Sequence, residues 1–294
     1  MNVDCRLLKK KKLEELKELI KDIDTPPVLA IIQVGNVDAS NIYIRNKRKA
    51  AEMIGIQTQL YHFEENVTEE DLKRQIKRLN EDEQVNGIFI QLPIPRHLNE
   101  KLLIDEIDPI KDVDGLTTYN LGNLISGQEG LTPCTPNAVI DILDELHCDM
   151  TGQNVVVIGR SRLVGLPLFH LLLQRHATID VCHSKTKDLK AHTIRADILV
   201  TAAGTQKNLI TEDMVKKGSI IIDVSIIRDE NNKLCGDVDY HNVVKKVSYI
   251  TPVPGGVGQL TVLELMKNTM KAYQLQKKVK KHSYNLKMKD TNKM

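Results

Sequence analysis

Aromatic residues are scarce in this sequence, which holds no Trp, three Phe and seven Tyr among 294 residues. The hydrophobic fraction is nevertheless 41%, so the core must be built from aliphatic side chains. Strands rich in Val, Ile and Leu are typical of parallel sheets whose two faces are both covered. Because the chain is too long for one small core, we expect two domains.

Paired cysteine motifs and long apolar runs are missing as well. The five cysteines are widely spaced and form no CxxC pair, which argues against a disulfide framework and against a cysteine zinc site. The longest apolar stretch, residues 163–173, is interrupted by Gly165, Pro167 and His170, so no membrane span is predicted. The N-terminal residues resemble no targeting segment. We therefore expect a cytoplasmic protein with no membrane partner, and the sequence predicts no metal site.

The charge balance excludes a basic footprint over the whole molecule. Lys and Arg number 41 against 39 Asp and Glu, a formal net charge of +2. Residues 271–294 are rich in Lys and contain a single acidic residue, Asp290, so the rest of the chain is net negative. Nucleic acid is therefore not an expected partner, and we expect the Lys-rich end to be a solvated helix.

Apolar strands alternate with amphipathic helices along the chain. We expect strands at residues 28–34, 58–62, 87–91, 155–158, 178–183, 198–202 and 220–224. We expect helices at residues 5–22, 40–54, 69–79, from about 99, at 135–147 and at 165–174. Alternation of this kind produces crossover units and parallel sheets. The predicted fold is therefore α/β: two α/β domains with parallel sheets, the C-terminal one Rossmann-like, and an active-site cleft between them.

A glycine turn at residues 159–165 links a buried strand to a helix. Glycines let a backbone approach phosphate groups, and the N-terminus of a helix presents free N–H groups to an anion. The spacing is not GxGxxG, so an ordinary strand-to-helix turn remains an alternative. The next strand ends at Ser184 and Lys185 instead of an acidic residue, while Asp180 lies inside it. Together with Arg160 in the turn, this favours a 2′-phosphate and therefore NADP over NAD.

Lys47 lies on the apolar face of the helix expected at residues 40–54. At 100° per residue it shares that face with Tyr43, one turn earlier. One interpretation is a lysine whose stem crosses apolar surface while its ammonium group stays in water. The other is an amine in a partly dry cleft that transfers protons near neutral pH. The sequence leaves both interpretations open.

Two further segments carry polar groups of interest. Gln91 ends a strand at the edge where open α/β sheets bind ligands, although it can also be a simple strand terminator. Residues 108–115 place Asp108, Asp112 and Asp114 in one short segment. A metal site lacks supporting ligands there; turn formation explains most such clusters. A carboxylate that accepts two parallel N–H bonds from a pterin-like group is the functional alternative.

Nine motifs in order make the chain resemble a known family. They are residues 34–47, 91–95, 108–115, 133–136, 159–167, 182–184, 196–197, 236–238 and 251–258. In this order they are similar to the bifunctional methylenetetrahydrofolate dehydrogenase/methenyltetrahydrofolate cyclohydrolases. The resemblance implies oxidation of 5,10-methylenetetrahydrofolate with NADP, followed by hydrolysis to 10-formyltetrahydrofolate. It also implies a homodimer, a folate-binding catalytic domain at 1–138 plus 262–294, and a Rossmann-like NADP-binding domain at 139–261.

The resemblance further assigns roles to particular residues. Lys47 would move protons in the hydrolytic step, Gln91 would bond to it, Tyr43 would stack on the folate and Asp114 would anchor the pterin. The implied cofactor contacts are Gly159, Arg160, Ser161, Ser184 and Ile226. The implied substrate contacts are Tyr43, Lys47, Ile90, Gln91, Leu92, Asp114, Pro254, Gly255, Gly256, Val257 and Gly258.

Some positions depart from the family pattern. Ser225-Ile226-Ile227 stands where the family has Gly-Ile-Asn, and Gln259-Leu260 stands where it has Pro-Met. These positions adjoin the implied cofactor and folate contacts. Two alternatives therefore stay beside the bifunctional enzyme: a dehydrogenase alone, using NADP or NAD, and a catalytically silent protein that binds folate or a nucleotide.

Overall fold

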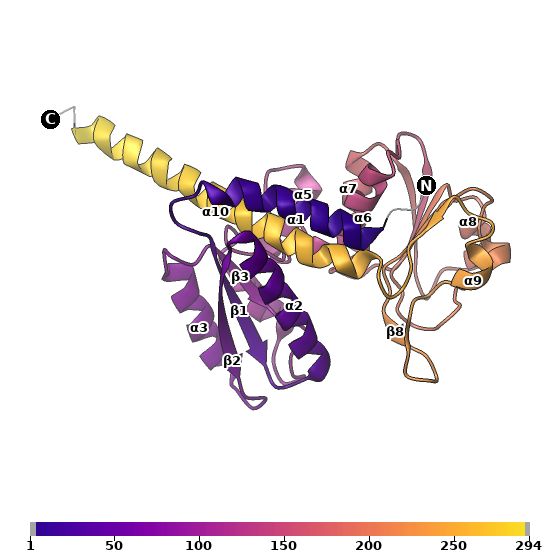
Figure 1. Ribbon diagram of the computed structural model, residues 1–294, viewed down its shortest axis with the longest axis horizontal. Coiled ribbons are helices and arrows are strands. Elements are labelled where there is room, and N and C mark those ends of the chain that lie inside the picture. The colour runs from indigo at the N-terminus through magenta and orange to yellow at the C-terminus, as the bar shows by residue number, and fades with distance from the viewer. Residues whose placement is uncertain (1–3, 292–294) are drawn as a thin grey trace. The chain divides into compact units, whose positions relative to one another are not determined.

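The computed structural model describes residues 4–291, and all side chains among them except those of Ala39 and residues 280–291 (Figure 1). The chain divides into two compact units, each with a parallel sheet. Unit 1 comprises the described residues up to Lys12, with Leu124–Gln128 and Pro133–Glu264. Unit 2 comprises Leu13–Asn123, Glu129–Thr132 and the described residues from Leu265 onward.

Unit 2 is built on a three-stranded sheet in the order β2-β1-β3, with parallel neighbours. Its strands are β1 (Val28–Val34), β2 (Gln57–Phe63) and β3 (Gly87–Ile90). The helices that lie within it are α2 (Asp38–Ile54), α3 (Glu69–Glu81) and α4 (Glu100–Asp105). Helices α1 (Cys5–Lys21), α5 (Thr118–Ser126) and α10 (Val257–Thr291) contribute residues to both units.

The side chains of β1 alternate between two faces of the unit 2 sheet, as expected for a strand. Val28, Ala30 and Ile32 join an aliphatic cluster with residues of α3 and with the loops that follow β3. Helices α2 and α3 lie on opposite sides of the sheet (Figure 1). Consequently β1 is buried along its whole length, and one of its faces is turned towards α2.

Unit 1 contains a five-stranded parallel sheet in the order β10-β7-β6-β4-β5. Its strands are β4 (Asn154–Ile158), β5 (Thr178–Cys182), β6 (Ile198–Thr201), β7 (Ile220–Asp223) and β10 (Tyr249–Ile250). A two-stranded antiparallel hairpin is formed by β8 (Ile227–Arg228) and β9 (Leu234–Cys235). The helices are α6 (Cys134–Glu145), α7 (Gly165–Gln174), α8 (Leu189–Thr193), α9 (Tyr240–Val243) and the 3₁₀ turn η1 (Glu212–Met214).

The predicted α/β class with two parallel sheets is confirmed, and several boundaries are refined. Helix α2 begins at Asp38, earlier than the expected start at residue 40, and its N-cap residue Val37 forms no side-chain cap. Gly55 ends this helix in the left-handed conformation, which a glycine adopts without strain. In the first helix Leu13, Leu16 and Ile20 are buried, whereas Leu19 is 63% exposed.

Within the described residues, none of the helices combines the length and the apolarity that a membrane crossing requires. All five cysteines are free thiols. Burial is the main factor that raises the pKa of Cys5, Cys148, Cys182 and Cys235 above the usual value. These thiols are therefore protonated at neutral pH.

Candidate functional site

Lys47 is a buried lysine on α2, with only 9% of its surface exposed. Its Nζ atom donates a hydrogen bond to Gln91 Oε1 at 3.0 Å. The same atom lies 3.6 Å from the centroid of the Phe89 ring. Of the two interpretations left open by the sequence, an ammonium group in open water is therefore wrong, and the amine is enclosed by side chains of unit 2.

Gln91 follows β3 and is itself 7% exposed. Its backbone N–H donates to Ile32 O at 2.9 Å, which extends the sheet pairing by one residue. Its Nε2 atom donates to Leu92 O at 2.6 Å. Because the amide nitrogen is occupied in this way, the amide oxygen is the atom turned towards Lys47. The glutamine is therefore more than a strand terminator: it orients an acceptor towards the amine.

Tyr43 lies one helical turn before Lys47 and is 36% exposed. The other members of the predicted apolar face, Ala50, Ala51 and Ile54, are buried. The helix therefore presents one partly accessible aromatic ring beside a buried amine. A ring in this position can stack on a flat ligand.

The carboxylates of the acidic segment 108–115 are of two kinds: some form structural hydrogen bonds, and one is a candidate for binding a ligand. Asp112 is 1% exposed and accepts hydrogen bonds from Thr117 N at 2.8 Å and from Asn120 Nδ2 at 2.9 Å. Asp108 Oδ1 accepts from Ile110 N at 3.0 Å. Turn formation therefore accounts for these two residues.

Lys111, in the same segment, is a second buried lysine with a structural role. Its Nζ donates to the carbonyl oxygens of Leu79, Asn80 and Asp82, at 2.9, 2.8 and 2.7 Å. These carbonyls belong to the end of α3, where the last turn of a helix lacks intrahelical partners. The lysine of this motif thus stabilises a helix terminus.

Asp114 is half-buried and lines a small pocket in unit 2. Ile90 and Leu92, two of the predicted substrate contacts, line the same pocket. The remaining lining is apolar except for Asp112. Two segments, one around residues 90–92 and one at residues 108–115, are therefore brought together, with the carboxylate of Asp114 at a mostly apolar surface. A group of three or more His, Cys, Asp or Glu side chains suited to a metal ion is not found among residues 4–291.

The glycine turn of unit 1 tolerates no side chain at its two ends. A Cβ atom at Gly159, where φ is +130°, would lie 2.8 Å from Ala202 O. A Cβ atom at Gly165 would collide with the carbonyl oxygen of Gly159. Ser161 Oγ accepts from Val164 N at 3.1 Å, just before α7 begins. The result is a closely packed turn at a helix N-terminus, with Arg160 and Ser161 exposed.

The loop after β5 is held by local hydrogen bonds. His183 N donates to Thr186 Oγ1 at 2.9 Å, and Lys185 N donates to His183 Nδ1 at 3.1 Å. Ser184 and Lys185 are exposed on this loop. No carboxylate occupies residues 182–187, the place where an NAD-binding fold has its ribose acid.

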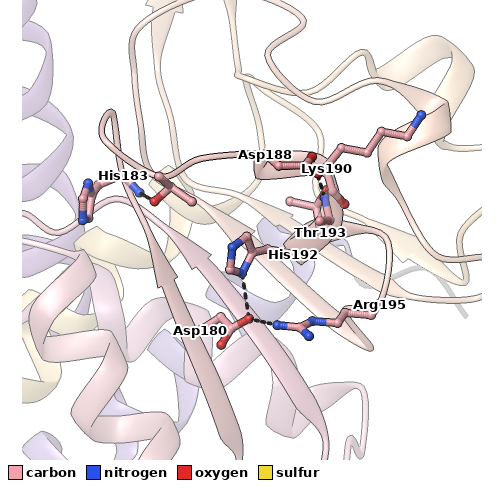
Figure 2. Close-up of polar contacts among 9 residues, drawn as sticks. Asp180, His183, Asp188, Lys190, His192, Thr193 and Arg195 are labelled. Atoms are coloured by element: carbon pink, nitrogen blue, oxygen red, sulfur yellow. Dashed lines mark hydrogen bonds and ion pairs between the residues drawn. The ribbon is translucent and has the colours of Figure 1, made fainter.

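Asp180, inside β5, is occupied by partners from and just after α8, as Figure 2 shows. His192 Nδ1 and Arg195 lie 2.9 and 2.5 Å from Asp180 Oδ2. Hydrogen bonds from His192 and then from Arg195 lower the pKa of Asp180. The side chain of Asp180 is 37% exposed and anchors the segment that contains α8.

Two buried carboxylates at the carboxyl ends of β6 and β7 were not singled out by the sequence reasoning. Asp237, with no exposed surface, accepts from Thr201 Oγ1 at 2.5 Å, Ser225 Oγ at 2.5 Å, Ala203 N at 3.0 Å and Gly204 N at 3.1 Å. One carboxylate therefore ties together the loops that follow both strands. The sequence feature that could have identified Asp237 was the motif at residues 236–238, which contains it.

Asp223 is the second of these carboxylates and ends β7. Burial, and secondarily the charge of Asp237, raise its pKa to about 7, although the N–H groups of Val238 and Ser225 act in the opposite direction. Ser225 donates its N–H to Asp223 Oδ1 at 3.0 Å and its hydroxyl accepts from Gly204 N at 3.0 Å. The serine that departs from the family pattern is therefore a bridge between both acids and the neighbouring loop.

The predicted folate contacts at residues 254–258 also lie in unit 1, where α10 begins at Val257. Gly256 is buried, and a Cβ atom there would lie 2.5 Å from Pro252 O. At Gly258 the added Cβ would lie 3.6 Å from Ile226 Cδ1. The structure thus brings one predicted cofactor contact next to one predicted substrate contact. The predicted residues form two sets, one in each unit.

The sequence matches two family models in succession. Residues 3–114 match the catalytic domain of tetrahydrofolate dehydrogenase/cyclohydrolase, and residues 133–277 match its NAD(P)-binding domain. The chain belongs to the tetrahydrofolate dehydrogenase/cyclohydrolase family. The predicted family, and with it a bifunctional enzyme of folate-dependent one-carbon metabolism, is confirmed.

Named relatives and solved structures agree with this membership. A bifunctional protein FolD from Nautilia profundicola is 46% identical over 273 residues, which cover 92% of this chain and 96% of the relative. A bifunctional FolD enzyme structure from Campylobacter jejuni has 45% identity and a TM-score of 0.90, with coverage of 93% and 98%. A Trypanosoma brucei FolD structure with NADP and an inhibitor has 36% identity and a TM-score of 0.88, with coverage of 93% and 97%.

Proposed function

We propose that this chain oxidises 5,10-methylenetetrahydrofolate with NADP⁺ and hydrolyses the methenyl product to 10-formyltetrahydrofolate. Family membership supplies the pair of activities. The observation that carries the assignment of residues is the hydrogen bond between the buried amine of Lys47 and Gln91. It supports a proton-transfer role for this amine, because Lys47 is buried while the ring of Tyr43, one turn earlier on the helix, is partly exposed.

In the hydrolytic step, water attacks the cationic methenyl carbon of the folate. Lys47 takes up a proton from the attacking water and returns one to N5 as the C–N5 bond breaks. Gln91 keeps the amine directed towards the folate, because its oxygen accepts from Nζ while its own nitrogen is held by Leu92 O. A positioned proton-transfer group of this kind accelerates a reaction by about 10²–10⁴-fold.

Binding of the folate is assigned to the surroundings of the amine. Tyr43 stacks on the aminobenzoyl ring, and Asp114 accepts the paired N–H groups of the pterin. Ile90 and Leu92 supply apolar surface beside that carboxylate, since all three line one pocket. Pro254, Gly255, Gly256, Val257 and Gly258 are proposed as further folate contacts.

The residues at the carboxyl edge of the unit 1 sheet fit NADP. The turn at Gly159 and Gly165 has no room for side chains, which suits backbone contact with a pyrophosphate. Arg160, Ser161 and Ser184 are exposed near a strand end without a carboxylate, which suits a 2′-phosphate. Ile226, 45% exposed, is assigned to the nicotinamide end. When bound, NADP⁺ accepts the hydride of the methylene carbon, and the protein residues align the two reactants.

Two alternatives are separated by one assay. The protein is mixed with methylenetetrahydrofolate and either NADP⁺ or NAD⁺, quenched with acid, and methenyltetrahydrofolate is measured by its absorbance. We expect product with NADP⁺, and a separate assay of methenyltetrahydrofolate hydrolysis should be positive. Product only with NAD⁺ and no hydrolysis would favour the dehydrogenase alone. A protein that forms no product with either cofactor would be a silent binding protein.

We also propose a homodimer, a cytoplasmic location and the domain limits 1–138 plus 262–294 and 139–261. Leu166 and Leu173 on α7 are 48% and 51% exposed, and apolar surface of this kind is common at interfaces. Free thiols are typical of a reducing compartment. Sedimentation equilibrium tests the dimer: a monomer at micromolar concentration would contradict it.

A further inference from the structure

Phe89 is a second partner of Lys47 that no sequence motif had marked. It lies in β3, two residues before Gln91, and successive side chains of a strand alternate between faces. Phe89 and Gln91 therefore point to the same face, the one turned towards α2. Phe89 is 5% exposed, and its ring centroid is 3.6 Å from Lys47 Nζ.

A ring at this distance can hold an ammonium group through its electron-rich face. Such contacts are strongest where water is excluded, and both Lys47 and Phe89 are buried. The Gln91 oxygen and the Phe89 ring are two fixed acceptors on one strand, so they restrict the amine in two directions. A long lysine side chain otherwise has several accessible rotamers.

We propose that Phe89 is a positioning residue for the hydrolytic step: its ring face holds the Lys47 amine, and the ammonium group that the amine becomes on taking up the proton from water, in line with Gln91. The proposal rests on the proposed role of Lys47 in hydrolysis. Phe89 itself transfers no proton and has no role in hydride transfer. Its contribution is electrostatic and geometric, and it therefore depends on the electron density of the ring as well as on its shape.

Fluorination of the ring tests this dependence with little change of shape. We would incorporate 4-fluoro- and 3,4,5-trifluorophenylalanine at position 89, and measure kcat and KM for methenyltetrahydrofolate hydrolysis. We expect kcat to fall stepwise, reaching about tenfold with three fluorines, while KM stays within twofold. Phe63, which packs against the aliphatic cluster of unit 2, is the matched control, and its trifluoro variant should keep the wild-type kcat.

Two further variants keep the outcomes distinguishable. Phe89→Leu removes the ring and should lower kcat at least as much as trifluorination, with thermal unfolding measured to verify folding. A trifluoro variant at position 89 with the wild-type kcat would overturn the role of Phe89. If Lys47→Met hydrolyses the substrate normally, the assignment of Lys47 is wrong and the role of Phe89 is overturned with it. Loss in Lys47→Met without any effect of fluorination rejects Phe89 alone.

Discussion

Lys47 in unit 2 and the Asp223–Asp237 pair in unit 1 are buried ionisable groups, but their partners differ in kind. Lys47 contacts side chains of a single strand end, through Gln91 Oε1 and the Phe89 ring. Asp237 accepts hydrogen bonds from the backbone and hydroxyl groups of separate loops. Side-chain contacts can be exchanged for a ligand by rotation, whereas backbone contacts fix the loops themselves. The difference separates an amine suited to chemistry from carboxyl groups that hold loops in place.

The largest effect is expected on the reactive side of this comparison. Lys47→Met removes the proton-transfer group and keeps an unbranched apolar side chain, so hydrolysis should fall by about 10³-fold while folding is retained. The measurement is methenyltetrahydrofolate hydrolysis, followed by absorbance, together with thermal unfolding. Lys49→Met, an exposed lysine of the same helix, is the control. Hydrolysis at the wild-type rate in Lys47→Met would contradict the assignment.

On the structural side, Asp237→Ala should act mainly on stability. It leaves the hydroxyls of Thr201 and Ser225 and the backbone N–H of Ala203 without their acceptor, at a cost of about 3 kcal/mol in the free energy of unfolding. Urea unfolding measures this loss. Asp239→Ala, two residues later and only half-buried, should cost less than about 1 kcal/mol. Similar losses in the two variants would show that Asp237 is no special anchor.

The raised pKa of Asp223 makes the free energy of unfolding depend on pH. Its folded value of about 7 exceeds the ordinary value of 3.8, so the folded protein keeps a proton that the unfolded chain releases between these values. Stability is therefore lost as the pH rises through this window, and no further loss follows above pH 7. From about pH 5.5 to 8 the free energy of unfolding should fall by about 2 kcal/mol because of this group.

Asp223→Asn removes the titration and is the control for this measurement. Urea unfolding at both pH values should show a smaller decrease in the variant than in the wild type. The same decrease in both proteins would mean that other groups cause the pH dependence. A carboxyl signal in ¹³C NMR that titrates near neutral pH in the wild type alone would assign it directly.

The smallest effect is expected for a charge that is exposed. Arg160→Ala should weaken binding of NADP⁺ by about tenfold, the equivalent of roughly 1.4 kcal/mol, and leave NAD⁺ binding and stability almost unchanged. Titration calorimetry with both nucleotides measures the ratio. Equal losses of affinity for the two nucleotides would show that Arg160 does not bind the 2′-phosphate, and would weaken the argument for NADP over NAD.

Periodicity predicted the parts of the site that depend on one element. The 3.6-residue repeat placed Lys47 on the buried face of α2, and the strand pattern placed Gln91 at the end of β3. Periodicity within one element could not predict contacts between segments that are distant in the sequence. Asp237 is positioned by the hairpin β8–β9, two short strands without a hydrophobic repeat, and its partner Asp223 lies on another strand. Phe89 was missed because an aromatic residue in a buried strand normally signals core packing.

The state of the cysteines has a practical consequence for experiments on the two units. A thiol reacts with alkylating reagents as the thiolate, and the raised pKa values of Cys5, Cys182 and Cys235 keep this form scarce at neutral pH. Thiol-directed dyes should therefore label the cysteines of the native protein only slowly. A single cysteine introduced at an exposed position would react much faster, so fluorophores can be attached to either unit and their separation followed while ligands bind.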